Sequence, residues 1–533
     1  MGYRKGKSMK EVRKQKVLRE WEKKKMSAIK EEISKDLDVN IMLVNKILGG
    51  KEKSGDLIIR HFNIGANSEF KTAIVYMDGL VDNATIDNFI LKTQMIETRG
   101  IDPERPITKD NLSEIIKRYS LTINEIAEID NMQKVISAIL YGDTVLFIDG
   151  SEKAFDLNTK GWEHRPVGEP HTENVIRGPK EAFTETLRVN TALMRIRLKD
   201  PDLRVKQLTV GERTNTYVAL VYIEGVADQT LLEQVERRIK KIEIDGVLES
   251  GYIEQMIEDS HWSPFPTLQY TERTDKAVAN VLEGKIVVIV DGTPFVLIAP
   301  SIFTQFYQSP EDYYERFWIG TFIRFIRLIS LFIALFAPSL YIALSSFHPE
   351  MIPSELEITM AAGRSTVPFP AIVEAMLMEI SIEILREAGV RLPGVIGPTI
   401  GIVGALVIGQ AAVQAGLVSP IMVIIVALTT IGSFACPSYN ASIAIRLLRF
   451  PMMISAALFG LYGMMLFTLL IILHLCSLKS FGVPYIAPIS PSHLGDLKDI
   501  LFRAPLQWMN RRPVTMKPED DTREETRGGG NDG

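Results

Sequence analysis

The sequence has little cysteine and little histidine. Only two cysteines, Cys436 and Cys476, occur among 533 residues, so the chain can hold at most one disulfide. Both fall in or beside apolar stretches, and we expect two free thiols in lipid-facing helices, with a single disulfide as the alternative. The seven histidines are scattered, and no pair has the spacing of metal ligands. The sequence therefore predicts no metal site.

The motifs of common enzymes are also missing. There is no GxxxxGK(S/T) loop, no HExxH, no CxxC and no serine in a GxSxG motif. The net charge of −5 offers no general attraction to nucleic acid. We therefore predict that the protein is not an enzyme, holds no cofactor and binds no nucleic acid. A membrane-anchored enzyme is the alternative, but no catalytic constellation supports it.

Charged residues are absent from residues 392–445. A membrane-spanning helix needs about 20 apolar residues, so this stretch suits two spans joined by a turn, which we place at residues 414–420. Uncharged runs at 328–344 and 450–478 predict two further spans. We therefore expect an α-helical transmembrane domain at 313–480.

The number of spans is four, or five if residues 368–388 also cross. With four spans both chain ends lie in the cytoplasm, but Arg446 and Arg449 then lie outside, against the usual bias of arginine toward the cytoplasmic side. With five spans these arginines move inside and the tail moves outside. Residues 348–364 are expected to form a loop, and a tail at 481–533 should be disordered at its end.

The N-terminal part shows no apolar signal segment. Residues 1–30 are rich in lysine and arginine, and no apolar stretch follows them, so we expect the soluble region to stay in the cytoplasm. The basic arm is either a solvated tail or a segment attracted to anionic lipid headgroups. Glu11, Glu20 and Glu22 interrupt it and favour the solvated tail.

A pattern of short β-branched strands occurs twice in the soluble region. Asp56 begins one copy and Asp202 the other, an offset of 146 residues, and each copy continues with a second strand and a helix. Residues 142–150 match residues 284–292 at an offset of 142. We infer an α/β region of two similar lobes, a duplicated unit whose hairpins predict a mixed sheet. The expected domains are a basic arm and short helix at 1–48, lobe 1 at 49–168, and a connector helix with lobe 2 at 169–312.

Each repeated strand ends at an acidic residue followed by glycine, at Asp78, Asp149, Glu224 and Asp291. Such pairs are typical of turns, because glycine tolerates a positive φ. A cleft between the lobes could instead bind a ligand at these positions. We favour simple turns.

The segment considered as a fifth span is apolar but carries several carboxylates. In a helix, Glu379, Glu383 and Glu387 share one face, whereas Glu374 points to nearly the opposite side. The acidic face fits two interpretations equally: a solvated side of a helix in the membrane interface, or the wall of an aqueous path that favours cations. Glu374 favours a functional role, since a carboxylate on an apolar membrane face is costly. We assign these four glutamates, together with Asn440, to a candidate ion path.

Small residues follow the acidic segment at Gly397, Gly401, Gly404 and Gly409. Gly397 and Gly401 form a GxxxG motif, which lets helices approach closely in lipid. We assign the four glycines to helix packing. A contact within the chain is the simpler explanation, and an assembly seam between chains is the alternative.

Several groups of residues occur in one order along the chain. They are Glu169-Pro170 with Val-Ile-Arg-Gly-Pro at 175–179, Ser-Pro-Phe-Pro at 263–266, Phe-Pro-Ala at 369–371 with the acidic segment up to Gly389, and Leu-Pro-Gly at 392–394 with Gly-Pro-Thr-Ile-Gly at 397–401. Together they resemble the A subunit of the GerA-type spore germinant receptors. The resemblance covers about residues 50–495.

The resemblance implies a location and a function. Such A subunits lie in the inner membrane of dormant bacterial spores, and act with a transporter-like B subunit that senses the nutrient and with a lipoprotein C subunit. It also implies a homo-oligomer that forms a nutrient-gated channel for monovalent cations, whose opening starts germination. A non-conducting signalling scaffold and a secondary transporter subunit are the alternatives. The transporter requires inverted repeats in the membrane half, and we find none there.

Overall fold

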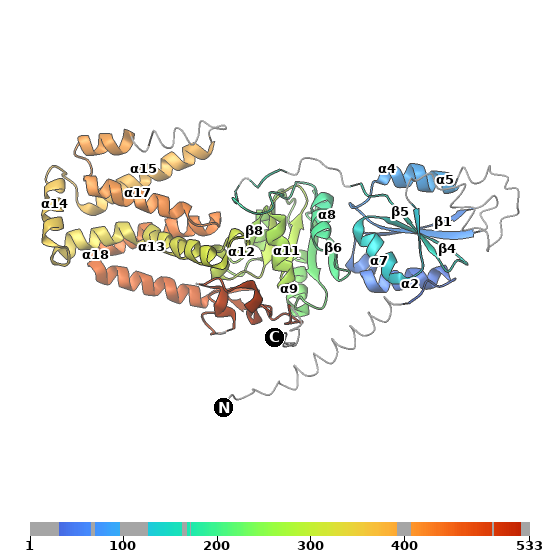
Figure 1. The fold of residues 1–533 in the computed structure, drawn as a ribbon. Coiled ribbons are helices and arrows are strands. Elements are labelled where there is room, and N and C mark those ends of the chain that lie inside the picture. Colours follow the sequence, from blue (N-terminus) through green and yellow to red (C-terminus); the bar gives the residue numbers. More distant parts are fainter. Residues whose placement is uncertain are drawn as a thin grey trace, which may run out of the picture.

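The computed structural model describes residues 31–64, 70–95, 126–161, 168–170, 172–391, 404, 407–492, 495–500 and 502–523. Two α/β lobes lie beside each other, and a domain of long helices follows on the far side of lobe 2 (Figure 1). This architecture confirms the predicted fold class, a duplicated α/β region followed by an α-helical domain. The basic arm, Gly397, Gly401 and the end of the tail lie outside the described residues.

Lobe 1 is a five-stranded sheet covered on both faces, with strand order β1-β2-β4-β5-β3. Successive residues of a strand point to opposite faces, so Phe147 packs toward α2 and α7, while Leu146 and Ile148 pack toward the π-helical segment η1. Its elements are α2 (Leu37–Leu48), α3 (Gly50–Lys53), β1 (Leu57–Ile64), β2 (Phe70–Met77), α4 (Asn83–Thr85), η1 (Ile86–Leu91), α5 (Lys92–Met95), β3 (Ile126–Ile129), α7 (Met132–Tyr141), β4 (Thr144–Ile148) and β5 (Ala154–Leu157).

Lobe 2 repeats this plan with strand order β6-β7-β9-β10-β8. Strand β9 reads Ile-Val-Val-Ile-Val and is buried along its whole length, as expected for a strand covered on both faces. The elements of lobe 2 are α8 (Leu187–Arg197), β6 (Leu203–Val210), β7 (Thr216–Ile223), α9 (Gln229–Lys240), α10 (Ser250–Ile257), β8 (Gln269–Thr271), α11 (Thr274–Leu282), β9 (Ile286–Val290) and β10 (Val296–Ala299).

The shared strand order confirms the predicted duplication. The prediction of a mixed sheet is wrong, because every strand pair of the two sheets in the described residues is antiparallel. The third strand of each unit, β3 or β8, lies at the outer edge next to the last strand. The chain therefore crosses to that edge before it returns to the centre of the sheet. On its return β4 runs antiparallel to β2, and β9 runs antiparallel to β7.

The four acid–glycine pairs are turns, and their glycines have φ between +84° and +90°. Two of the acids also cap helices: Asp149 accepts a hydrogen bond from the backbone N–H of Leu37 (3.4 Å), and Asp291 accepts one from that of Leu187 (2.9 Å). Helix α2 is thus the counterpart of α8. It packs into the core of lobe 1, although we placed it before that lobe.

One buried ion pair and one partly exposed ion pair join the two lobes. The Arg195 guanidinium of α8 donates two hydrogen bonds to Asp56 of lobe 1, at 2.7 Å and 3.0 Å, and a third to the backbone oxygen of Leu203 at 2.9 Å. The Arg195 and Asp56 side chains are only 2% and 5% exposed. Arg188 pairs with Asp78 across the same boundary. These pairs hold lobe 1 directly against lobe 2.

The helical domain begins where lobe 2 ends. Two of its helices, α13 and α18, are long and apolar enough to cross a membrane by length and composition, and α17 is a shorter apolar helix. The elements are η4 (Phe303–Phe306), α12 (Glu311–Tyr314), α13 (Phe317–Phe347), η5 (Pro349–Met351), α14 (Ser354–Arg364), α15 (Ala371–Arg391), α17 (Pro420–Phe434) and α18 (Tyr439–Ser477). The loop predicted at 348–364 is wrong, because α14 occupies most of it. The turn predicted at 414–420 is confirmed by Gly416, with φ of +65°, and by Ser419, which caps α17.

Helix α18 folds back on itself at Gly460, whose φ of 60° and ψ of −142° are not helical. The Ser455 hydroxyl donates to the backbone oxygen of Gly463 at 2.8 Å, although eight residues of straight helix would separate them by about 12 Å. Leu475, near the end of α18, packs with Ala441 near its start. The element is therefore a hairpin of two arms, residues 439–459 and 461–477, where we predicted a single last span.

Consecutive helices run in alternate directions between lobe 2 and the far end of the domain (Figure 1). Helix α13 leads away from lobe 2, and α15 leads back. Residues 407–414 lead away again, α17 leads back, and the α18 hairpin goes out and returns. Arg446 and Arg449 lie in the first arm of this hairpin, inside the helical domain rather than in a loop on either side. Both arrangements had placed these arginines before the last span, whereas they belong to the first arm of α18; the side of the membrane on which they lie stays a prediction.

The tail returns to lobe 2. It contains β11 (Lys479–Ser480), β12 (Val483–Pro484), η6 (Asp496–Asp499), η7 (Leu506–Trp508) and η8 (Val514–Met516). Ser480 donates to the backbone oxygen of Thr267 at 2.6 Å, and the Glu519 N–H donates to that of Val226 at 2.8 Å. The tail and the lobes thus lie on the same side of the helical domain, which answers a question that the sequence left open.

Both cysteines are free thiols. Cys476 lies near the end of α18 and is exposed, in agreement with the expected helical position. Cys436 lies in the short break between α17 and α18, where its thiol faces the backbone oxygens of Phe306 and Ser438. Cys436 therefore does not occupy a lipid-facing helix as we expected.

Candidate functional site

Helix α15 carries the four glutamates of the candidate ion path. Pro370 precedes the helix, and its carbonyl oxygen accepts hydrogen bonds from the backbone N–H groups of Val373 and Glu374. Glu374 lies in the first turn, where a negative charge interacts favourably with the helix dipole. The α15 segment is a single helix of 21 residues, so the predicted spacing of the carboxylates holds.

Glu374 lies at the end of the domain that is far from lobe 2. Its side chain is fully buried and accepts a hydrogen bond from the backbone N–H of Ser419 at 2.9 Å. The Nε of Arg364, at the end of α14, lies 3.3 Å from the other carboxylate oxygen. Glu374 therefore ties α14 and α15 to the turn that begins α17, instead of facing lipid.

Glu379 is paired with Arg449 of the α18 hairpin, and both side chains are 1% exposed. The same guanidinium donates from Nε to the backbone oxygen of Ala334 in α13 at 2.8 Å. Arg449 thus links three helices. In the described residues, Oε1 of Glu379 and Nη2 of Arg449 have no hydrogen-bond partner.

Glu383, one turn further along α15, is shared between two arginines. Arg446 Nη1 lies 2.9 Å from one carboxylate oxygen, and Arg386 Nη1 lies 3.4 Å from the other. Arg386 also reaches Ser433 of α17 at 3.3 Å. The Glu383 side chain is 29% exposed, so water reaches it more easily than it reaches Glu379.

Glu387 completes the row and pairs with Arg391 on the same helix at 2.6 Å. The exposure of the row rises from 1% at Glu379 through 29% at Glu383 to 65% at Glu387. The row therefore runs from the interior of the domain to its surface near lobe 2. Each carboxylate of the row faces an arginine in the isolated chain, which leaves no uncompensated acidic face among these residues.

The remaining predicted positions lie apart from this row. Asn440 is partly buried in the first turn of α18, and no hydrogen bond joins it to the glutamates within the described residues. A Cβ on Gly404 would come within 2.7 Å of Leu385 of α15, and one on Gly409 within 3.4 Å of Val423 of α17. Both glycines therefore allow close contacts within the chain.

Sequence reasoning did not identify the arginine partners. Arg364, Arg446 and Arg449 come from other helices, and Arg449 lies 70 residues from Glu379. One signal was available: arginine inside an apolar segment normally pairs with an acid or a backbone carbonyl. We instead considered Arg446 and Arg449 only as markers of membrane sidedness.

A second ionic cluster fixes the start of α13. Arg324 and Arg327 both contact Asp312, at 3.2 Å and 3.1 Å, and Arg324 also lies 2.9 Å from Asp499 of the tail. Tyr313 donates its hydroxyl to Asp499. Burial raises the pKa of the Asp499 carboxyl above its ordinary value, although the Arg324 guanidinium opposes this. The cluster joins the end of lobe 2, the first membrane helix and the tail.

No three His, Cys, Asp or Glu side chains gather as a metal site in the part of the chain that the structure describes. The chemistry of both clusters is therefore that of carboxylates and guanidinium groups. Such groups can bind, exchange or exclude ions.

Comparison with known proteins identifies the family. A sequence profile described as Bacillus/Clostridium GerA spore germination protein matches residues 44–515. The chain is 46% identical to spore germination protein KA of Bacillus subtilis (strain 168) over 492 residues, which are 92% of this chain and 89% of that protein. It is 40% identical to spore germination protein GerLA of Bacillus cereus over 488 residues, which are 91% of this chain and 98% of that protein.

A solved structure is also similar to part of the chain. It is the crystal structure of the N-terminal domain of the A subunit of the Bacillus megaterium spore germinant receptor GerK3. The match is 36% identical, covers 51% of this chain and 98% of that one, and has a TM-score of 0.40. On the family profile and the full-length relatives, the chain belongs to the GerA family of spore germination proteins, as an A subunit.

Proposed function

We propose that this chain is the membrane subunit of a germinant receptor in the spore inner membrane, and that copies of it assemble into a nutrient-gated channel for monovalent cations. A transporter-like B subunit and a lipoprotein C subunit complete the receptor, and the lobes lie in the cytoplasm. The observation that carries the channel proposal is the row of carboxylates on α15, which leads from the buried Glu379 to the exposed Glu387. Carboxylates repeated around an oligomeric ring attract cations.

The arginine partners suggest how such a channel stays closed. While Arg446 and Arg386 hold Glu383, its charge is compensated and a cation gains little by approaching. Opening then requires a movement that separates Glu383 from its arginines. Glu383 suits this role because it is partly exposed, whereas the Glu379–Arg449 pair is buried and anchors three helices.

A non-conducting signalling scaffold is the second candidate. The same full pairing of the carboxylates favours it, because charges that are always paired stabilise a structure without attracting ions. The two functions differ in what a neutral residue at position 383 does. In a channel it changes ion flow, and in a scaffold it changes only stability.

The test is potassium flux from liposomes that contain the purified chain, with and without its partner subunits. Glu383→Gln should reduce cation flux and cation selectivity, because it removes the partly exposed charge of the row. Glu355→Gln is the control, because it removes an exposed glutamate of α14 that lies outside the row. The abundance of each variant in the membrane is measured alongside.

Two results would contradict the channel. One is equal flux through the wild type and Glu383→Gln at equal abundance. The other is no flux in any combination of subunits, with the assembly shown intact by size. The second result would favour the scaffold.

A further inference from the structure

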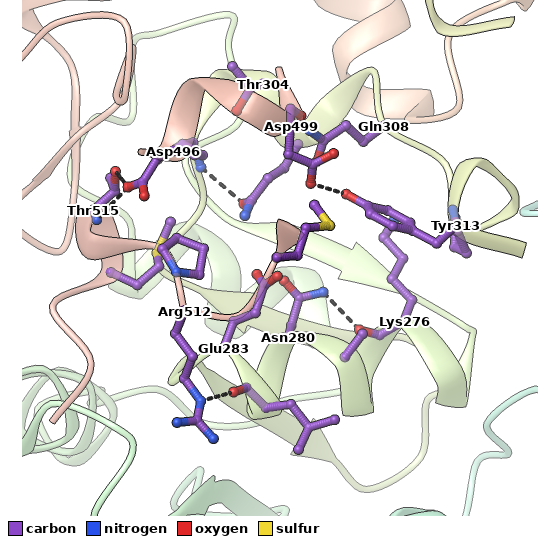
Figure 2. Close-up of a pocket in the computed structure, with 18 of the residues that line it drawn as sticks. Lys276, Asn280, Glu283, Thr304, Gln308, Tyr313, Asp496, Asp499, Arg512 and Thr515 are labelled. Carbon is purple, nitrogen blue, oxygen red and sulfur yellow. Dashed lines mark hydrogen bonds between the residues drawn. The ribbon is translucent and has the colours of Figure 1, made fainter. Parts of the chain in front are cut away.

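A cavity of about 460 Å³ lies where lobe 2, the entry to the helical domain and the tail meet. Helix α11 contributes Asn280, the segment 302–314 contributes Tyr313, and the tail contributes Thr515. In Figure 2, Tyr313 and Thr515 lie on opposite sides, and Asn280 lies on a third. Because the tail forms part of the cavity wall, the cavity exists only when the tail has docked on lobe 2.

Most charged side chains around the cavity are already held in ion pairs, and Asp496 instead accepts hydrogen bonds from the backbone N–H groups of Val514 and Thr515 at 3.2 Å and 3.0 Å and from the Thr515 hydroxyl at 2.7 Å. The pairs and their N···O distances are Lys276–Glu173 at 2.5 Å, Glu283–Arg523 at 3.1 Å and Arg324–Asp499 at 2.9 Å. A charged ligand would have to break one of these ion pairs or hydrogen bonds, or enter without a counter-ion. Both options cost free energy in a partly buried site, so the lining disfavours a charged ligand.

Uncharged polar groups are available instead. The Thr304 hydroxyl makes no hydrogen bond to another described residue, although the side chain is only 3% exposed. Gln308 uses one amide N–H on the backbone oxygen of Asp499 at 2.6 Å, and an amide has further donor and acceptor capacity. Pro310, Pro488 and Met509 supply apolar surface between these groups. Cavities of this size with a few convergent polar groups are typical of small-molecule sites.

We propose that this cavity binds a small uncharged organic molecule that carries several hydroxyl or amide groups. This site is separate from the ion path proposed above and does not depend on it. The hydroxyl and amide groups of the ligand hydrogen-bond to Thr304 and Gln308, and its carbon frame lies on the apolar surface.

A ligand in the cavity should affect how firmly the first membrane helix is held. Tyr313 and Gln308 line the cavity, and both hydrogen-bond to Asp499. Asp499 in turn holds Arg324 of α13, whose side chain is fully buried. A ligand that contacts Gln308 and Tyr313 therefore changes how firmly α13 is held, and by thermodynamic linkage the position of α13 changes the affinity for the ligand.

The test uses the full chain in lipid nanodiscs and saturation-transfer NMR with myo-inositol, D-glucose and inositol monophosphate. The wild type should bind at least one of the two uncharged probes, and should bind inositol monophosphate more weakly than myo-inositol. Thr304→Val keeps the shape but removes one hydrogen bond, so it should weaken binding about five-fold. Thr267→Val is the matched control, since Thr267 is a buried threonine near β8 that does not line the cavity.

Hydrogen exchange in residues 320–327 of α13 measures the coupling, and should slow when the uncharged probe is bound. Saturation transfer from neither myo-inositol nor D-glucose would overturn the proposal. Tighter binding of inositol monophosphate would overturn the uncharged class, and equal losses in Thr304→Val and Thr267→Val would overturn the site. These readouts do not involve ion flux, so their failure is distinct from failure of the channel.

Discussion

Removing one partner of the buried pair between Glu379 and Arg449 should destabilise the helical domain strongly, whereas removing both should not. Both side chains are 1% exposed, so a single change leaves an uncompensated charge inside the domain. Such a change costs about 3–5 kcal/mol in other proteins. Arg449→Met also loses the hydrogen bond to the Ala334 carbonyl, which adds about 1 kcal/mol. Glu379→Gln should therefore be the milder of the two single variants.

The double variant Glu379→Gln with Arg449→Met carries no charge at the site, and its stability should lie within about 2 kcal/mol of the wild type. The measurement is thermal unfolding in nanodiscs, followed by intrinsic fluorescence. Each single variant should unfold roughly 10 °C below the wild type, because each kcal/mol of lost stability lowers the melting temperature by about 2–4 °C. Glu387→Gln is the control, because its pair is exposed and worth less than about 1 kcal/mol.

The reasoning is refuted if the two single variants unfold within a degree of the control. That result would mean that water already solvates Glu379 and Arg449. The pair would then line a hydrated path through the domain instead of anchoring its helices.

Three further outcomes follow from the geometry. Gly460→Ala should lower the yield in the membrane and cost about 1–3 kcal/mol, because its φ of 60° and ψ of −142° suit glycine alone, whereas Gly363→Ala on α14 should be neutral in the same assay. Asp56→Asn should cost about 3 kcal/mol of stability, since it leaves the buried Arg195 without its counter-ion. It should also speed amide hydrogen exchange in the segments where the two lobes meet. Unchanged exchange in these segments would contradict the buried pair. Burial raises the pKa of Glu254 from the ordinary 4.5 to about 7, so the contribution of this carboxyl to stability is greatest below pH 4.5 and is lost as the pH rises through 7. Chemical denaturation at pH 8 should show Glu254→Gln about 2 kcal/mol more stable than the wild type, and equal pH profiles would exclude this carboxyl as the cause.

Much of the fold was predictable from the sequence because the signals are local. The repeated strands gave the duplication, since a strand covered on both faces is a run of β-branched residues in each copy, as in residues 286–290. A membrane span was expected at the uncharged run 328–344, and α13 contains this run and extends over Phe317–Phe347. The direction of the strands was not predictable in this way, because it depends on the edge to which β3 and β8 cross.

The candidate site was predictable only in part. The spacing of Glu379, Glu383 and Glu387 on one helix is a local property and was correct. The partners were not predictable from spacing, because Arg446 and Arg449 reach α15 only through the reversal of α18 at Gly460. That reversal depends on a single glycine within an uninterrupted apolar run, and hydropathy alone does not distinguish it from a straight span.

The docked tail has a consequence for the order in which the protein is made. Its binding surface on lobe 2 is synthesised early, yet Ser480 comes 213 residues after Thr267, and Arg523 comes 240 residues after Glu283. Lobe 2 must therefore leave the ribosome with this surface uncovered, and it stays uncovered until every helix has been inserted. A chain with one crossing too few would carry its tail to the opposite side of the helical domain, where Ser480 and Glu519 could not reach lobe 2. Docking of the tail therefore requires that the helices between lobe 2 and the tail bring the chain back to the side on which lobe 2 lies.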